Sequence, residues 1–416
     1  MHRGTGMQEG GRGPRVAVLD TIHGGGIIAA RMVESGLQAE PLEVYHHTPD
    51  ISGYDLVACP VHLSPRNPAL AQARREKKRI ITHHQAVGEL LCPRSRPALQ
   101  VFEVTGTHSK TTSALLLSLI LSSQKGVLSH TTRGLEIWEE GRPRLLRSGL
   151  SITPGSVIAA VDAAEAERAD ALVAEVSLGG TGLADYGIIT SLTGDYLIAG
   201  GTKWASTAKL QMLSLAKRGA KILCNADARL SSDVTFASGG AVRARPGALI
   251  FAGESVQLKT DESLHFPSYE TAIAAAAAAA WECGLTAGEI ARSLSGFAGF
   301  SGRMKILRDG GTVLFDCSNS GLKAGDVQKA LDLAKGEGLT VVVGEDAETV
   351  CEGMDIPALT DLLRQCEAER IILVGERLQP LAEEISAEWA ADLDEGLAKA
   401  RGGCPKRLLS CVKCFR

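Results

Sequence analysis

The sequence predicts an α/β fold with mostly parallel sheets, divided among three domains. Short apolar runs rich in β-branched residues alternate with helical stretches along most of the chain, which is typical of βαβ units. Aromatic residues make up only 4% of the 416 residues, while Ala and Gly are abundant. This composition favours helices packed closely on a parallel sheet over an all-β sandwich. The length exceeds what one ordinary core accommodates, so two or three domains are expected.

The first domain is expected over residues 15–94. Residues 1–14 are polar and Gly-rich and lack the apolar segment of a signal peptide, so a disordered extension is expected there. A linker containing Pro93 and Pro97 is expected over Leu91–Pro97 and marks the end of the domain. Within the domain the pattern predicts strands at Arg15–Asp20, Tyr54–Ala58 and Arg79–Thr82, a glycine turn at Gly24–Gly26, and a helix at Ile27–Ser35.

The central domain is expected over residues 95–300. It begins with an apolar strand at Leu99–Thr105, followed by a glycine-bearing turn and a helix at Thr112–Ser122. An Ala-rich helix over Thr271–Trp281 has small side chains that permit close packing. Further strands are predicted at Ala171–Val176, Tyr186–Thr190 and Ala220–Asn225.

The third domain is expected over residues 301–400, with a tail at 401–416. Strands are predicted at Val313–Asp316, Leu339–Val343 and Arg370–Val374, with helices between them. The tail contains Cys404, Cys411 and Cys414, and no fourth metal ligand lies nearby in the sequence. A frayed tail is therefore expected, with a metal or redox role as the alternative.

Charge, hydropathy and cysteine usage limit the function classes. The formal net charge of −4 provides no basic field for nucleic acid. No apolar run reaches the ~18 residues of a membrane span. Seven scattered cysteines, several of them within apolar segments, together with the missing signal peptide, favour reduced, buried thiols in the cytoplasm. These are Cys59, Cys92, Cys224, Cys283, Cys317, Cys351 and Cys366.

The sharpest local motif is TGTHSKTT, which follows an apolar strand and opens a helix. In that context, backbone N–H groups at the helix start can bind phosphate oxygens. Lys110 can reach the β- and γ-phosphates of a nucleotide, and the Thr111 hydroxyl can hold Mg²⁺. The alternative is an ordinary strand–turn–helix with a surface lysine. The predicted nucleotide contacts are Gly106, Thr107, His108, Ser109, Lys110, Thr111 and Thr112.

Ser109 stands where such loops usually have a glycine before the lysine. Glycine serves there because the backbone crowds the phosphate and often needs a positive φ. Serine is small enough to follow a similar path at some strain, so we expect the loop conformation to be kept.

The order of these segments resembles the Mur ligase superfamily, which includes folylpolyglutamate synthases. The resemblance runs from about residue 99 to residue 380. The superfamily's Mg²⁺-binding glutamate is matched by Glu175 in ALVAEVSLG. Its Asp-His pair is matched by Asp195, but Tyr196 replaces the histidine that would bind a second Mg²⁺. The lysine that is carbamylated in many members is matched by Lys209.

The same resemblance implies an ATP-dependent ligase with Rossmann-like N-terminal and C-terminal domains around a central P-loop ATPase domain. It implies ATP and Mg²⁺ as cofactors, with Lys110, Glu175 and Lys209 as catalytic residues and Thr111, Glu175 and Lys209 as metal ligands. It also implies nucleotide contacts from Asn225, from Arg303 in the Gly302-Arg303 motif, and from Asp316 in LFDCSNSG.

The N-terminal domain is similar to that of one branch of this superfamily, the coenzyme F430 synthetases of methanogenic archaea. The similarity lies in VLDTIHGGGIIA, EVYHH, CPVHLSP and ITHHQAVG, together with VLSHTTRG and SITPGS further on. It implies a nickel tetrapyrrole polycarboxylate as the substrate. It also implies activation of a propionate-type carboxylate by ATP as an acyl phosphate, and closure of a carbocyclic ring by attack of a ring carbon.

Six of the ten histidines lie between His23 and His84, next to predicted strand ends. Histidines can supply the donors and cations that a polycarboxylate macrocycle needs around its rim. The alternative is that they are ordinary exposed loop histidines. The predicted substrate contacts are His23, Gly24, Gly25, His62, His83, His84 and His130.

Two other functions stay open. An amide-forming ligase of the same fold would add an amino acid to a cofactor or peptide precursor, and a degenerate homologue would bind nucleotide without turnover. Ser109 and Tyr196 favour the second. A P-loop GTPase or kinase is disfavoured, because no N-K-x-D-type base-recognition motif follows the loop. The sequence identifies neither the base for ring closure nor the oligomeric state. His130, Tyr196 and the N-terminal histidines are unranked candidates for the base.

Overall fold

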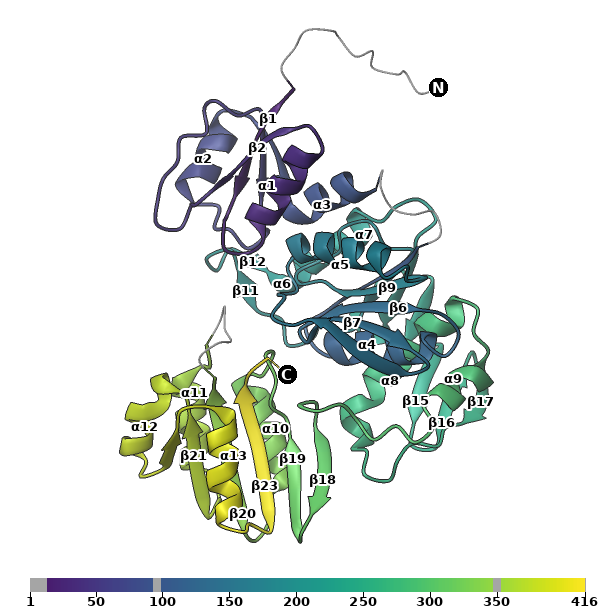
Figure 1. Ribbon diagram of the computed structural model, residues 1–416, viewed down its shortest axis with the longest axis vertical. Helices are drawn as coiled ribbons and strands as arrows, with labels where there is room; N and C mark the ends of the chain where they lie inside the picture. Colours follow the sequence, from purple (N-terminus) through teal and green to yellow (C-terminus); the bar gives the residue numbers. More distant parts are fainter. Residues whose placement is uncertain (1–12, 93–98, 347–352, 416) are drawn as a thin grey trace. The chain divides into compact units, whose positions relative to one another are not determined.

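The computed structural model describes residues 13–92, 99–346 and 353–415 (Figure 1). They form two compact units. The first holds the residues up to 114 and residues 121–235, and the second holds residues 115–120 and those from 236 onwards. Three separate α/β sheets correspond to the three predicted domains, and a short two-stranded sheet is added to them. No helix among the described residues is long and apolar enough to cross a membrane.

The first sheet has four parallel strands in the order β2-β1-β3-β4, with helices on both faces (Figure 1). Side chains alternate along β1: Val16 and Val18 pack with α1 and α3, whereas Ala17 and Leu19 pack with α2. This is the Rossmann-like arrangement predicted for the N-terminal domain. The elements are β1 (Arg15–Leu19), α1 (Gly25–Glu34), β2 (Gln38–Leu42), β3 (Leu56–Cys59), α2 (Pro68–Arg75), β4 (Arg79–Thr82) and α3 (His83–Leu91).

The central sheet in the first unit has the strand order β13-β10-β5-β9-β6-β7-β8. The strands from β13 to β6 are parallel, and β7 and β8 extend the sheet as an antiparallel hairpin that the sequence did not predict. The strands are β5 (Gln100–Thr105), β6 (Val127–Thr131), β7 (Gly134–Glu139), β8 (Arg142–Arg147), β9 (Ala171–Glu175), β10 (Tyr186–Ile189) and β13 (Lys221–Asn225). The helices are α4 (Lys110–Leu121), α5 (Pro154–Ala166), α6 (Ala205–Lys209), α7 (Gln211–Ser214) and η1 (Ala226–Ala228), and β11 (Leu197–Ile198) pairs with β12 (Lys203–Trp204).

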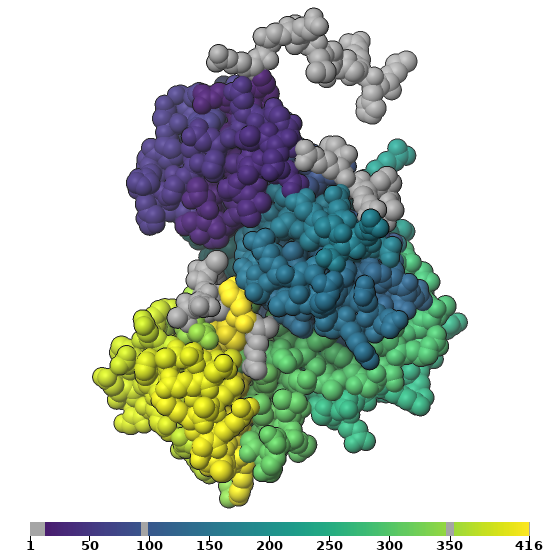
Figure 2. Space-filling model, in the orientation of Figure 1, coloured from purple at the N-terminus to yellow at the C-terminus, as the bar shows by residue number. Residues whose placement is uncertain are grey.

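The first sheet and the central sheet of this unit share one hydrophobic core. Helices α1 and α3 pack against α5, so that Ile28, Val87 and Val161 belong to the same buried cluster. In the space-filling view the purple N-terminal residues lie directly against the blue-green central residues (Figure 2). The hydroxyl of Thr82 donates to Gln211 Oε1 at 2.7 Å and adds a polar contact between the two parts.

The second unit contains an antiparallel sheet portion, two helices and the C-terminal sheet. The Ala-rich helix is confirmed, and its residues Ala272–Ala280 are at most 1% exposed. The first part contains β15 (Val242–Arg245), β16 (Ala248–Phe251), β17 (Glu254–Gln257), α8 (Phe266–Glu282) and α9 (Ala287–Ser293); β14 (Val234–Phe236) crosses the unit boundary.

The C-terminal sheet has the order β18-β19-β23-β20-β21-β22, and every pair except β18–β19 is parallel. Its strands are β18 (Lys305–Asp309), β19 (Thr312–Asp316), β20 (Leu339–Glu345), β21 (Arg370–Val374), β22 (Glu388–Ala390) and β23 (Arg407–Lys413). Its helices are α10 (Ala324–Ala334), α11 (Ile356–Arg364), η2 (Glu376–Leu378), α12 (Gln379–Glu384) and α13 (Leu393–Gly402).

The prediction of a frayed tail at 401–416 is wrong. Strand β23 lies in the interior of the C-terminal sheet, between β19 and β20. Cys411 and Cys414 are buried in hydrophobic clusters on opposite faces of that sheet. Because residues three apart on a strand face opposite sides, the C-x-x-C spacing cannot bring both thiols to one metal.

The nine described cysteines are free thiols, as predicted, but they are not all buried. Cys92 and Cys404 are exposed. Cys351 lies outside the described residues, as do residues 1–12 of the predicted extension and residues 93–98 of the predicted linker. Residues 91 and 92 of that linker prediction instead complete the end of α3. The domain boundaries after residues 94 and 300 stay predictions.

Candidate functional site

The TGTHSKTT motif forms the turn between β5, which ends at Thr105, and α4, which begins at Lys110. Ser109 adopts a left-handed φ of 62°, so the conformation expected for a glycine is kept by serine. Gly106 lies so close to the next strand that a Cβ there would be 2.2 Å from Thr190 Oγ1. The motif therefore has the strand–turn–helix form that brings backbone N–H groups together at a helix start.

The residues that follow strand β10 hold this turn in place through hydrogen bonds. The N–H of Thr107 donates to the carbonyl of Ser191 at 2.9 Å. The hydroxyl of Thr190 donates to the carbonyl of His108 at 2.5 Å, and the amide of Asn225 donates to the carbonyl of Thr190 at 3.0 Å. Asn225 thus fixes the strand that holds the loop, and its predicted contact with the nucleotide stays a prediction.

Lys110, Thr111 and Glu175 converge beside the loop. Strand β9 pairs in parallel with β5, which places Glu175 opposite Val104 at the carboxyl end of the sheet. The Thr111 hydroxyl donates to Glu175 Oε2 at 2.7 Å, and the Lys110 ammonium nitrogen lies 3.9 Å from Glu175 Oε1. Glu175 is only 1% exposed. Thr111 and Glu175 are 64 positions apart in the sequence, and the structure brings them together as the predicted site requires.

The donor set at this point fits Mg²⁺. A hydroxyl oxygen and a buried carboxylate oxygen are the oxygen ligands that Mg²⁺ prefers, and it commonly uses only one or two of them together with phosphate oxygens. Thr111 and Glu175 supply this pair, and Thr112 continues the first turn of α4 as a buried residue. Their roles as metal ligands stay predictions, but the geometry supports them.

Lys209 ends helix α6 and is buried, with 1% of its surface exposed. Its ammonium nitrogen lies 5.8 Å from the centre of the Tyr196 ring, so the residue that replaces the family's histidine faces this lysine. Asp195 accepts hydrogen bonds from the N–H groups of Tyr196 and Ser206, both at 2.9 Å. Desolvation acts to raise the pKa of Asp195, but the hydrogen bonds from Ser206 and the charge of Lys209 lower it overall.

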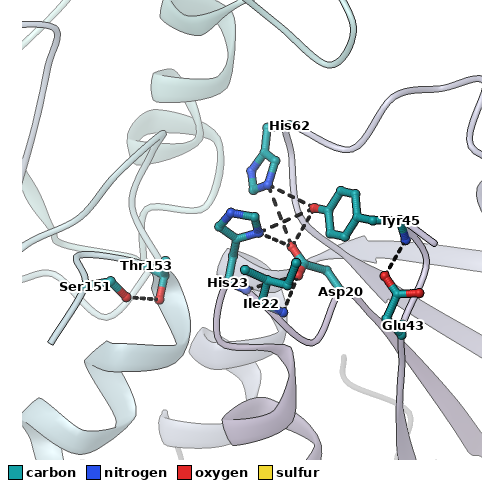
Figure 3. Close-up of polar contacts among 8 residues, drawn as sticks. All are labelled: Asp20, Ile22, His23, Glu43, Tyr45, His62, Ser151 and Thr153. Carbon is teal, nitrogen blue, oxygen red and sulfur yellow. Dashed lines mark hydrogen bonds and ion pairs between the residues drawn. The ribbon is translucent and has the colours of Figure 1, made fainter. Parts of the chain in front are cut away.

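The predicted histidines divide into an exposed pair and a buried set. His23 and His62 lie together at the carboxyl end of the first sheet, and solvent can reach both (Figure 3). Gly24 has a left-handed φ of 91° and approaches Thr153 at the start of α5. Gly25 begins α1 next to it. This group of predicted substrate residues is brought together by the structure.

His83, His84 and His130 are buried, with at most 2% exposed. His84 Nε2 lies 2.7 Å from the carbonyl of Ser177, and His130 Nε2 lies 3.1 Å from the carbonyl of Ser151. Desolvation lowers the pKa of each of the three histidines to about 4, so they are neutral at pH 7. They are not the exposed loop residues of the alternative interpretation. Contact with a substrate would require the chain to move, and their substrate role stays a prediction.

Arg303 and Asp316 lie next to each other in the second unit. Asp316 accepts a hydrogen bond from the N–H of Gly302 at 2.9 Å, and Arg303 donates to Asn319 Oδ1 at 3.1 Å. The Gly302-Arg303 turn is thereby held against the end of β19. Their contacts with a nucleotide stay predictions.

Three residues of these sites were not predicted as functional. Thr190 follows β10 and supports the phosphate loop, while Asp20 and Tyr45 surround His23 and His62. The available signal was position, because each lies just beyond the carboxyl end of a parallel strand, where open sheets bind ligands. Tyr45 even stands in the quoted EVYHH motif.

Comparisons with solved structures agree with the predicted fold. Bifunctional folylpolyglutamate synthase/dihydrofolate synthase from Yersinia pestis CO92 superimposes with a TM-score of 0.59 at 17% identity, covering 80% of this chain and 90% of that one. MurF from Acinetobacter baumannii gives 0.57 at 17% identity, covering 82% and 79%. A crystal structure of the former type of enzyme contains Mn, AMPPNP and L-glutamate. At these identities the likeness shows the fold.

Sequence comparison is more specific. The family described as "Coenzyme F430 synthetase CfbE, C-terminal domain" matches residues 306–414. The coenzyme F(430) synthetase of Methanocaldococcus jannaschii is 24% identical, over 86% of this chain and 83% of that protein. The coenzyme F(430) synthetase of Methanosarcina acetivorans is 36% identical, over 97% of this chain and 99% of that protein. The chain therefore belongs to the coenzyme F430 synthetase family.

Proposed function

We propose that this protein is an ATP-dependent cyclo-ligase that closes the final carbocyclic ring of the nickel tetrapyrrole coenzyme F430. The seco-acid precursor would supply the carboxylate, and ADP and phosphate would be the other products. Family membership supports the pathway step, and the convergence of Lys110, Thr111 and Glu175 supports the use of ATP. That convergence is the observation on which the proposal depends.

The phosphate loop would bind the β- and γ-phosphates of ATP. The backbone N–H groups that precede α4 and the positive end of its dipole favour an anion there. Lys110, which is partly exposed, can turn from Glu175 towards the γ-phosphate and neutralise charge as the phosphoryl group moves to the substrate carboxylate. The hydrogen bond from the Thr190 hydroxyl to the His108 carbonyl holds the backbone of the loop in place before ATP binds.

Thr111 and Glu175 would hold Mg²⁺, which supplies positive charge next to the phosphates of ATP when it is bound. Lys209 would add a carboxylate ligand if it is carbamylated, as the resemblance to the superfamily implies. The place of Lys209 supports this, because its side chain is buried and lies near Tyr196, the residue that stands where the superfamily has a metal-binding histidine.

The N-terminal sheet would bind the tetrapyrrole. The imidazoles of His23 and His62 lie at the carboxyl end of the sheet, and Tyr45 next to them is 40% exposed. Donors of this kind can hold the carboxylates of a macrocycle, and the ring of Tyr45 can contact its apolar body. The proposed reaction uses a small molecule, involves no nucleic acid or membrane, and would take place in the cytoplasm.

The decisive experiment is an assay with the nickel seco-tetrapyrrole acid, ATP and Mg²⁺, in which mass spectrometry follows the loss of one water from the substrate. We expect Lys110→Ala to lower turnover by about 100-fold or more, the size of effect seen when a charge-stabilising group is removed. Lys329→Ala is the matched control, because Lys329 is an exposed lysine on α10.

Other outcomes would contradict the proposal in specific ways. Near-normal turnover by Lys110→Ala would show that the loop is misassigned. ADP release that depends on an added amino acid, without loss of water from the tetrapyrrole, would establish an amide-forming ligase instead. No ATP turnover with the seco-acid or with any amine would indicate a nucleotide-binding homologue without activity.

A further inference from the structure

Four polar side chains meet beyond the carboxyl ends of the strands in the N-terminal sheet (Figure 3). We call them the Asp20 cluster: Asp20, His23, Tyr45 and His62. Asp20 directly follows β1, Tyr45 follows β2 and His62 follows β3. These strands are adjacent and parallel, so their carboxyl ends lie next to one another. The cluster is distinct from the Lys110–Glu175 site and is built from the residues of the N-terminal sheet alone.

Asp20 is fixed so that one of its oxygens faces the two histidines. It is fully buried and adopts a left-handed φ of 84°, which is uncommon for a residue other than glycine. Its Oδ1 accepts hydrogen bonds from the N–H groups of Ile22 at 2.7 Å and His23 at 3.0 Å. Its Oδ2 lies 2.6 Å from His23 Nδ1 and 3.7 Å from His62 Nε2. Backbone strain of this kind is characteristic of functional sites.

Tyr45 and the two histidines surround the buried carboxylate of Asp20. The Tyr45 hydroxyl donates to Asp20 Oδ2 at 2.9 Å. A buried carboxylate thus lies beneath two imidazoles whose side chains are 24% and 30% exposed, and which solvent can reach.

The donor atoms have the spacing of a metal site. The Asp20 oxygen and one nitrogen each from His23 and His62 all lie within 4.8 Å of one another. The two imidazole rings are 4.6 Å apart at 80°, so they approach from different directions. Two imidazole nitrogens with one carboxylate suit zinc, nickel or cobalt, whereas Mg²⁺ and Ca²⁺ select oxygen ligands. The hydrogen bonds from Tyr45 and from the backbone to the carboxylate would orient this ligand.

We propose that the group formed by Asp20, His23 and His62 is a binding site for one divalent transition-metal ion. Such an ion could come from two sources, a free metal ion or the nickel of a tetrapyrrole. A free ion would use all three side chains. A nickel ion already held by the four nitrogens of a tetrapyrrole has only axial positions left, so one histidine would bind it and Asp20 would orient that histidine. The second source rests on the proposed function, and the first does not.

The first arm of the test uses the metal alone. Full-length chain without a histidine tag, stripped of metal by chelation, is titrated with Co²⁺ and with Ni²⁺, and binding is followed by calorimetry and by the visible spectrum of Co²⁺. If the source is a free ion, we expect one ion per chain, and affinity at least about tenfold weaker in His23→Ala, His62→Ala and Asp20→Asn. His47→Ala is the matched control, because His47 is an exposed histidine of the same domain. Thermal melting checks that each variant is folded.

The second arm uses the nickel seco-tetrapyrrole acid without ATP, and follows the shift of its nickel-dependent absorption on binding. If the source is the macrocycle, we expect the shift to be lost in one histidine variant and kept in the other and in His47→Ala. Failure of free ions to bind, together with a macrocycle spectrum that does not depend on either histidine, would overturn the proposal and leave a hydrogen-bonded Asp–His–Tyr cluster. Because both arms read binding without turnover, this result is separable from failure of the ligase assay.

Discussion

At the scale of single residues, Ser109 is where the phosphate loop departs from the usual glycine. Its φ of 62° costs a non-glycine residue roughly 1–2 kcal/mol. We expect Ser109→Gly to keep Mg·ATP binding within about twofold, since glycine adopts this φ without strain. We expect Ser109→Val to weaken binding by about tenfold or more, because a β-branched residue resists positive φ and each 1.4 kcal/mol is tenfold in affinity. Calorimetric titration with Mg·ATP measures both.

Ser109→Ala separates backbone strain from loss of the hydroxyl. Alanine shares the φ preference of serine, so its affinity should stay near that of the native protein. Native-like affinity in Ser109→Val would show that the loop does not need the left-handed conformation to bind the nucleotide.

His130 should make the first unit sensitive to acid. Desolvation lowers its pKa to about 4, from an unfolded value of about 6.5. The unfolded chain therefore binds a proton more readily, and stability is lost as the pH falls from about 6.5 towards 4. From pH 7.5 to pH 5, we expect this histidine alone to lower the free energy of unfolding by about 2 kcal/mol. Urea denaturation of His130→Gln should show that much less pH dependence, whatever its stability at pH 7.5.

The matched control for this measurement is His47→Gln, because His47 is an exposed histidine in the same unit. It removes an imidazole that is exposed to solvent, so an effect that both variants share does not come from burial of the ring. An unchanged pH dependence in His130→Gln would show that the buried ring is protonated in the folded protein.

At the scale of elements, helix α3 is the closest link between the first sheet and the central sheet. A Cβ at Gly88 would lie 2.1 Å from the carbonyl oxygen of Thr181, so no side chain fits between the helix and that turn. We expect Gly88→Ala to destabilise the protein by about 1–3 kcal/mol through overpacking. In contrast, Gly26 in α1 has open space around its Cα, and Gly26→Ala should be neutral or stabilising by about 0.5–1 kcal/mol. Melting temperatures compare the two; equal values would show that α3 can shift freely.

The elements predicted from the sequence were those whose signal is local. The strands at β1, β4, β5, β9 and β13, and the Ala-rich helix, have apolar runs or periodicity of their own, and they are confirmed. The hairpin β7–β8 was missed because β8 is exposed along most of its length, so its residues show no apolar face. Strand β23 has an apolar run, LLSCV, but its place near the end of the chain favoured a frayed tail.

The residues of the candidate site were likewise predicted where a local motif or a family match indicated them, and missed elsewhere. Lys110 and Thr111 come from one motif, and Glu175 was placed by a family match at a strand end, so their meeting could be expected. Of the Asp20 cluster, His23 and His62 were predicted from their places at strand ends. Their convergence on Asp20 and Tyr45 was not, because it depends on three loops whose conformations are set by tertiary contacts. The burial of His83, His84 and His130 also follows from packing between α3, α5 and the sheets, which no local pattern records.

At the scale of the whole molecule, each unit has hydrophobic clusters of its own. One buried cluster of the first unit runs from Val16 to Leu183, and the C-terminal sheet is built around clusters formed by residues 304–414. Removal of the last strand should therefore unfold the C-terminal sheet and spare the first unit. This distinguishes a structural strand from the dispensable tail that the sequence suggested.

A chain that ends at Gly403 tests this. Without β23, the strands β19 and β20 lose their common partner. Leu408, Leu409 and Val412 are at most 1% exposed, and each contributes roughly 1.5–3 kcal/mol by burial. Their combined loss is comparable with the whole stability of a domain, about 5–15 kcal/mol. We expect limited proteolysis, followed by mass spectrometry, to digest residues 304–403 rapidly while residues 15–92 and 99–235 stay protected.

A chain that ends at Cys414 is the matched control, because it keeps all of β23. It should resist the protease as the full chain does. If the chain ending at Gly403 were equally resistant over residues 304–403, the interior position of β23 would contribute little to the fold. Protease sensitivity confined to those residues would instead show that the last strand completes the C-terminal sheet, because a parallel sheet cut between β19 and β20 leaves two edges with unpaired N–H and C=O groups.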